Sequence, residues 1–160
     1  MTERASVSLG EEAERFVVEH VRCPSCASPL RRLPPGYPLF DLQCSRCLFR
    51  AQVKRVQEKP RSRLRGGSWN VVSTYLRTGQ LLPPMFVCFD WPRSQPEPGC
   101  VYFFPLVPAK NVVKRVLSNQ HRTDAGRAMA EYRDMLSLPH EVVGGAPRVL
   151  PSHGLVDEVH

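Results

Sequence analysis

Long apolar runs are missing from this chain of 160 residues. No stretch approaches the roughly 18 consecutive apolar residues that a membrane span requires. The first residues, Met-Thr-Glu-Arg-Ala-Ser, also lack the apolar segment of a secretory signal, so we expect a cytoplasmic protein with no membrane partner. Apolar residues make up 42% of the chain and charged residues 23%, which excludes a wholly disordered protein and leaves room for one core.

Acidic residues are scarce in one part of the chain. Residues 42–80 contain nine lysines and arginines but a single acid, Glu58, while the formal charge of the whole chain is +7. The excess is densest in residues 59–67, which end in Gly66-Gly67 and are expected to form a flexible basic loop. Such a loop suits a nucleic-acid phosphate backbone, and an ordinary solvated loop is the alternative. The candidate contacts are Arg50, Arg55, Lys59, Arg61, Arg63 and Arg65.

Four of the six cysteines form two Cys-x2-Cys knuckles, Cys23–Cys26 and Cys44–Cys47, with seventeen residues between them. This spacing is typical of a tetrahedral zinc site, and four thiolates leave no open position on the metal. Two redox pairs or disulfides are the alternative, but disulfides are not expected without a secretory signal. The pattern predicts a structural zinc ion held by Cys23, Cys26, Cys44 and Cys47. Cys88 and Cys100 lie in apolar runs and are expected to be buried, or else paired with each other or with a partner.

Hydrophobic periodicity predicts an α+β (or α/β) domain in which helices flank a central mixed sheet. Ser8 is the expected N-cap of a helix over residues 11–21, and the knuckle Cys44–Cys47 the turn between two strands. The expected strands are 37–43, 48–56, 85–91 and 100–107, and the later helices 68–77, 111–117 and 124–136. We therefore divide the chain into a flexible N-terminus (1–7), a zinc-containing domain (8–137) and an irregular tail (138–160).

Three polar residues are expected to meet at the hairpin formed around the second knuckle. Asp41 precedes the turn, whereas Gln52 and Lys54 follow it on one face of the next strand. Asp41 and the Gln52 amide oxygen are hard ligands suited to Mg²⁺, and Lys54 could activate water or stabilise a phosphorane. This combination suits phosphodiester hydrolysis. An ordinary solvated strand face is the alternative.

The run from Cys23 to Lys54 resembles a known nuclease family. Asp41 followed by Gln52-Val-Lys54 is similar to the Asp…(Asp/Glu/Gln)-x-Lys signature of the PD-(D/E)xK superfamily. Its interleaving with four cysteines is similar to the catalytic domain of DpnI-like restriction endonucleases. The resemblance implies a restriction-endonuclease-like fold with a zinc-knuckle insertion, and an endonuclease that cleaves DNA with Mg²⁺ or Mn²⁺, of the restriction or defence type. It also implies an acid from the first helix, for which Glu14 is the candidate, although Glu14 could simply be solvated.

Gln52 departs from the commoner carboxylate at its position, although glutamine occurs there in Mrr-like nucleases, and we expect weaker metal binding in consequence. Two other functions therefore stay open. One is a catalytically silent, zinc-stabilised module that binds nucleic acid or a protein. The other is a nuclease subunit that needs a larger assembly.

Overall fold

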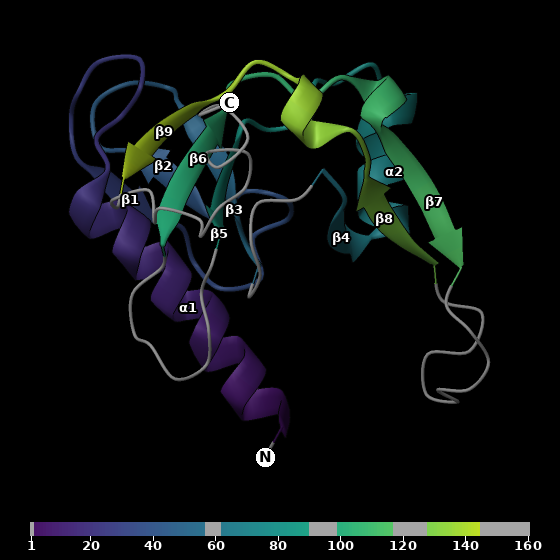
Figure 1. Cartoon of the computed structure of the whole chain (residues 1–160), viewed down its shortest axis with the longest axis horizontal. Helices are drawn as coiled ribbons and strands as arrows, with labels where there is room; N and C mark the ends of the chain where they lie inside the picture. The colour runs from purple at the N-terminus through teal and green to yellow at the C-terminus, as the bar shows by residue number, and fades with distance from the viewer. Residues whose placement is uncertain (1, 57–61, 90–98, 117–127, 145–160) are drawn as a thin grey trace, which may run out of the picture.

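Two β-sheets lie on either side of a shared core (Figure 1). The computed structural model describes residues 2–56, 62–89, 99–116 and 128–144, and of residues 2–9 only the backbone. Within these residues the fold is α+β, as expected, with a mixed sheet of six strands and an antiparallel sheet of three. The two α-helices are α1 (Thr2–His20) and α2 (Trp69–Arg77).

The larger sheet has the strand order β1-β2-β3-β5-β6-β9. Its strands are β1 (Leu30–Arg32), β2 (Leu42–Cys44), β3 (Arg50–Arg55), β5 (Met85–Phe89), β6 (Cys100–Phe104) and β9 (Glu141–Gly144). The first three strands form an antiparallel meander, and its second turn is the knuckle Cys44–Cys47. β3 then pairs in parallel with β5, while β5 and β6 are antiparallel. The expected mixed sheet is therefore confirmed, as is the hairpin around the second knuckle.

The smaller sheet has the order β4-β8-β7. Its strands are β4 (Leu64–Ser68), β7 (Val112–Val116) and β8 (Ala128–Tyr132). α2 packs against β4 and β8, and a 3-10 turn over Met135–Ser137 follows β8. The helix over 68–77 was predicted from the sequence, with Ser68 at its N-cap and Gly79 just beyond its end at a φ of +73°.

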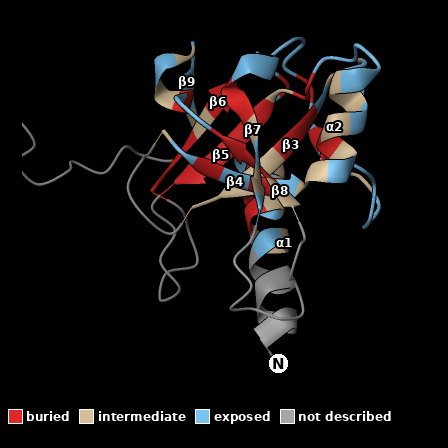
Figure 2. Cartoon of the chain, turned by 90° about the vertical axis from the view of Figure 1, so that its right-hand side faces the viewer, coloured by how far each residue is buried: buried red, intermediate tan, exposed pale blue. Residues whose placement is uncertain are grey.

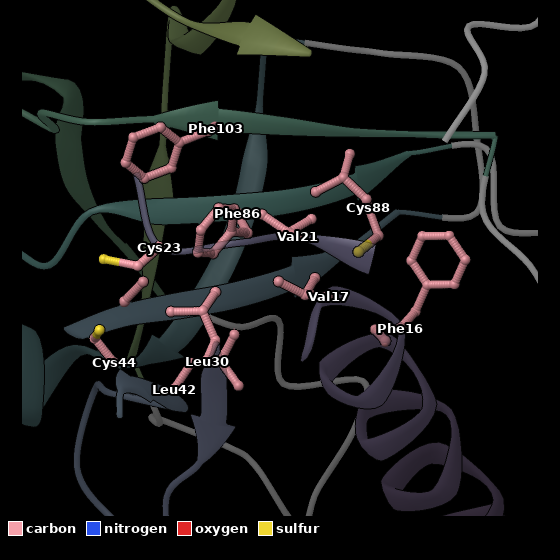
Figure 3. Packing of buried hydrophobic residues seen from close by; sticks show 13 residues of the cluster. Phe16, Val17, Val21, Cys23, Leu30, Leu42, Cys44, Phe86, Cys88 and Phe103 are labelled. Atoms are coloured by element: carbon pink, nitrogen blue, oxygen red, sulfur yellow. The ribbon is translucent and has the colours of Figure 1, made fainter. Parts of the chain in front are cut away.

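Both faces of the larger sheet are covered. Side chains alternate between the two faces along a strand, and apolar residues point to each face. On one face, Phe86 and Cys88 pack against Val17 and Val21, at the end of α1 (Figure 3). On the other face, Met85, Val87 and Phe89 pack against the smaller sheet and α2. Figure 2 shows the resulting burial of β5 and β6. Cys88 and Cys100 are both buried, as expected, and no disulfide joins them to each other.

The two helices predicted over 111–117 and 124–136 are wrong. Val112–Val116 is strand β7 and Ala128–Tyr132 is strand β8, and the two pair with Val112 opposite Tyr132. The apolar spacing of these short segments fits a helix as well as a strand, and pairing in the second sheet decides between them. Residues 117–127, which include the start of the second predicted helix, lie outside the described residues.

The ends of several elements also differ from the prediction. α1 begins at Thr2 rather than at residue 11, so Ser8 lies inside the helix and residues 2–7, assigned to a flexible end, are helical. The first predicted strand is shorter, since only Leu42–Cys44 pairs, and β1 was missed. β9 lies within the tail predicted to be irregular. None of the described helices is both long enough and apolar enough to span a membrane.

Candidate functional site

The two knuckles bring their four cysteines together, and Cys23 and Cys44 belong to the core between α1 and the larger sheet. The Sγ atoms of Cys23, Cys26, Cys44 and Cys47 all lie within 4.8 Å of one another. The Cys23–Cys47 pair is separated by 3.6 Å and the Cys26–Cys44 pair by 3.5 Å. Zinc–sulfur bonds of about 2.3 Å in a tetrahedron place sulfur atoms about 3.8 Å apart. The clustering predicted from the sequence is confirmed, and its geometry fits one zinc ion.

Backbone N–H groups of the second knuckle point at its sulfur atoms. Arg46 and Cys47 each donate to the Cys44 Sγ at 3.3 Å, and Phe49 donates to the Cys47 Sγ at 3.4 Å. Such donors stabilise thiolates, the form in which cysteine binds a metal. Because Cys44 also ends β2, the cluster fixes the hairpin that carries the other candidate residues.

Asp41 is the last residue before β2, and it lies beside Ala51 and Val53 of β3. Its backbone N–H donates to the Ala51 carbonyl at 2.9 Å, which extends the β2–β3 ladder by one residue. Its Oδ2 accepts a 2.7 Å hydrogen bond from the Val53 N–H. Burial raises the pKa of the Asp41 carboxyl, against the hydrogen bond from Val53 and the charge of Lys54. The hairpin therefore brings Asp41 to the segment Gln52–Lys54, as the sequence predicts.

Glu14 reaches the same place from α1. Its carboxyl group lies close enough to Asp41 for the two to interact electrostatically, and its Oε2 contacts Arg32 Nη2 at 2.9 Å and Nε at 3.1 Å. Burial raises the pKa of the Glu14 carboxyl and the Asp41 charge raises it further, while Arg32 lowers it. Glu14, Arg32 and Asp41 line a cavity of about 200 Å³ beside the loop 33–37. The structure thus places the helix acid close to Asp41, and β1, which the sequence analysis missed, supplies the arginine that pairs with Glu14.

Lys54 lies on β3, next to Val53, whose backbone N–H binds Asp41. Burial lowers the pKa of its ammonium group, and the charge of Asp41 opposes that shift. Lowering the pKa of a lysine moves it toward the range in which it can exchange protons at neutral pH. Asp41 and Lys54 are therefore electrostatically coupled, as expected from their positions on the hairpin.

The sequence analysis predicted that Gln52 lies on an open polar face of β3, and this prediction is wrong. It is only 5% exposed, and its Oε1 faces the Tyr132 hydroxyl of the smaller sheet at 3.5 Å. The prediction failed because the smaller sheet covers this face, and that sheet was not foreseen. The amide of Gln52 thus joins the two sheets, whereas Glu14 supplies the carboxyl group that lies close to Asp41.

The basic residues fall into different environments. Arg50 is exposed, and it donates to the Tyr37 hydroxyl at 2.9 Å and lies over the Phe40 ring. Arg55 is half-buried, and its charge acts on the buried Cys88 thiol. Lys59 and Arg61 lie outside the described residues.

The expected flexible loop is in part a strand, β4, which carries Arg65 and begins just after Arg63. A Cβ atom built at Gly66 would lie 2.4 Å from Tyr132 Cε2, so this glycine allows close packing between β4 and β8. Gly66 therefore has a packing role, and the interpretation of Gly66-Gly67 as a sign of flexibility is wrong.

A scan against models of protein families and a search of curated proteins both returned no match to this chain. The residues themselves therefore carry the functional argument.

The shared environment of Glu14 and Asp41 gives an expected pH dependence of stability. A carboxyl group with a raised pKa in the folded protein contributes stability below the ordinary carboxyl pKa near 4, and that contribution is lost as the pH rises through the raised value. We expect Glu14→Gln, measured by thermal unfolding without Mg²⁺, to melt a few degrees above wild type at pH 7.5 and at the same temperature near pH 4. Glu19→Gln, an exposed position on the same helix, is the control. A Glu14→Gln protein that melts below wild type at pH 7.5 would show that the ion pair with Arg32 outweighs burial.

Proposed function

We propose that this protein is a metal-dependent nuclease that hydrolyses phosphodiester bonds in DNA. The observation that carries the proposal is the convergence of two carboxyl groups, Glu14 and Asp41, beside the Lys54 ammonium and a cavity. The resemblance of Asp41 and Gln52-Val-Lys54 to the PD-(D/E)xK signature supports it, as does the mixed central sheet.

Two neighbouring, half-buried carboxyl groups fit a divalent cation. The charge of Asp41 raises the cost of ionising Glu14, and a hard cation such as Mg²⁺ or Mn²⁺ relieves that repulsion through oxygen ligands. Asp41 and Glu14 would hold the ion, which supplies Lewis-acid stabilisation of the phosphate and of the attacking water when bound. The hydrogen bond from Val53 fixes one Asp41 oxygen, and Arg32 fixes the Glu14 carboxylate. Lys54 would orient the water and stabilise negative charge on the phosphate.

The four-cysteine cluster has a different part in this proposal. A structural zinc ion there would hold the turn between β2 and β3, and so the distance between Asp41 and Lys54. With four thiolate ligands it would have no open position for substrate.

A second candidate function is a catalytically silent module that binds nucleic acid or protein. Two observations favour it. Arg32 already pairs with Glu14, and the Gln52 amide faces Tyr132 instead of joining the carboxyl pair. A nuclease subunit that is completed by a larger assembly would share these features, because a partner could displace Arg32.

Cleavage assays separate these functions. We expect wild-type protein to nick plasmid or single-stranded DNA when Mg²⁺ or Mn²⁺ is present, and Lys54→Ala to lose at least about 100-fold in rate. The control is Lys114→Ala, at an exposed lysine of β7, which should keep the wild-type rate. Wild-type protein that cleaves neither substrate with either metal would favour the silent module or the subunit.

A further inference from the structure

One acid on the outer face of the smaller sheet is covered by arginines. Glu131, in the middle of β8, is only 2% exposed. Its neighbours Ala130 and Tyr132 point into the core between the sheets. Because side chains alternate along a strand, Glu131 points away from that core, to the face where solvent would be expected.

Three guanidinium groups enclose its carboxylate. Arg63 Nε lies 3.0 Å from Oε1, Arg133 Nε lies 3.8 Å from Oε1, and Arg115 Nη1 lies 3.8 Å from Oε2. The contacts to Oε1 are ion pairs rather than aligned hydrogen bonds. The arginine side chains themselves stay open to solvent, with 66% of Arg63, 51% of Arg133 and 40% of Arg115 exposed. A fourth arginine, Arg65, is exposed directly opposite Glu131 on β4.

We define the arginine surface as Arg63, Arg65, Arg115 and Arg133. Three of these guanidinium groups contact the Glu131 carboxylate, and Arg63 and Arg133 also line a cavity of about 420 Å³ together with Ser62 and Asp134. Each guanidinium carries five N–H donors, so two carboxylates cannot saturate them. The surplus of donors and of positive charge suits phosphate oxygens, which arginine binds through paired hydrogen bonds.

The surface is held in place before any ligand arrives. Ser62, next to Arg63, accepts a 3.0 Å hydrogen bond from the Met135 N–H at its carbonyl and a 3.3 Å bond from the Leu136 N–H at its Oγ. Arg65 and Arg115 lie on strands that pair with β8 on either side. Preorganised side chains lose less entropy on binding than those of a mobile loop.

We propose that the arginine surface binds the phosphate backbone of a nucleic acid, with Glu131 as the positioning residue that sets the directions of its arginines. The proposal deepens the nuclease function and rests on it for the choice of ligand. The Tyr132 hydroxyl, next along β8, faces Gln52 of the strand that carries Lys54, so the surface and the candidate site are joined through one strand.

Binding measured without divalent cations tests this surface apart from catalysis. The probes are fluorescein-labelled duplexes of two unrelated sequences and one single strand, followed by anisotropy over a range of NaCl concentrations. We expect Arg63→Gln/Arg115→Gln/Arg133→Gln to bind all three probes about tenfold more weakly or worse, with a salt slope flatter by about two to three. The control is Arg22→Gln/Arg31→Gln/Arg46→Gln, which removes equal charge from exposed positions in the zinc-bearing part of the chain.

Each outcome decides the proposal. Equal losses in the two triple variants would overturn it, because overall charge would then explain binding. A wild-type protein that binds no probe at low salt, or a loss confined to one sequence, would overturn it as well. Cleavage by the wild-type protein is measured in a separate assay with Mg²⁺ or Mn²⁺. A negative binding result for the arginine surface therefore leaves the nuclease proposal standing. If the triple variant does not fold, the single Arg63→Gln variant should still flatten the slope by about one.

Glu131→Gln tests the positioning role. The substitution adds one net positive charge to the surface, so binding should tighten if charge alone matters. If Glu131 orders the arginines, binding should weaken at least about threefold in spite of the added charge, with unchanged zinc content and circular dichroism. Tighter binding by a folded Glu131→Gln protein would contradict that role.

Discussion

Cys44→Ser is expected to remove the zinc ion and most of the stability of the fold. Cys44 is 2% exposed, lies in the core between α1 and the larger sheet, and pairs with Leu30 of β1. Its Sγ accepts two backbone N–H bonds and belongs to the four-sulfur cluster. Structural zinc contributes folding free energy directly, on the order of 10 kcal/mol in small zinc domains, so losing one ligand should cost more than about 4 kcal/mol.

Metal analysis and thermal unfolding measure this effect together. Wild-type protein should contain one zinc ion per chain, and Cys44→Ser should contain little and melt at least about 10 °C lower. Ser45→Ala changes the neighbouring exposed residue of the same knuckle and should match wild type in both measurements. Wild-type protein without zinc, or a Cys44→Ser protein that keeps the wild-type melting temperature, would contradict the zinc assignment.

The features that the sequence predicts correctly depend on short stretches of chain. The two knuckles are fixed by their spacing, and the hairpin between β2 and β3 follows from a knuckle placed between two strands. The β5–β6 pairing follows from two neighbouring apolar runs. In each case the residues that make contact are close in the sequence, so pattern and contact coincide.

The features that were missed depend on residues far apart in the chain. β4 and β8 are separated by 59 residues of the chain, and no local pattern in 64–68 records that partner. Without the smaller sheet, the face of β3 that carries Gln52 seemed open, and the segment with Arg63 and Arg65 seemed a loose loop. The pairing of Glu14 with Asp41 could be expected from the resemblance alone, because helix periodicity does not say which end of a sheet an acid reaches. Arg32, between them, sits on a strand of only three residues.

The carboxyl pair leads to the sharpest expectation about catalysis. If Asp41 and Glu14 hold the divalent ion, Asp41→Asn should lower the cleavage rate at least about 1000-fold, because it removes the charge next to Lys54 while its amide oxygen can still accept the bond from Val53. Glu14→Gln should leave measurable cleavage but raise the Mg²⁺ concentration required by about tenfold or more, since a neutral oxygen attracts the ion less strongly.

Gln52→Ala separates this arrangement from the one predicted by the sequence signature. The Gln52 amide faces Tyr132, so we expect its removal to lower stability and to change the Mg²⁺ requirement less than about threefold. Rates are measured at several Mg²⁺ concentrations on one plasmid, with Glu19→Gln as the control for a lost carboxylate on α1. If Gln52→Ala raises the Mg²⁺ requirement as much as Glu14→Gln does, Gln52 is a metal ligand and the helix acid is not the second one. If Asp41→Asn cleaves at the wild-type rate, the active site lies elsewhere.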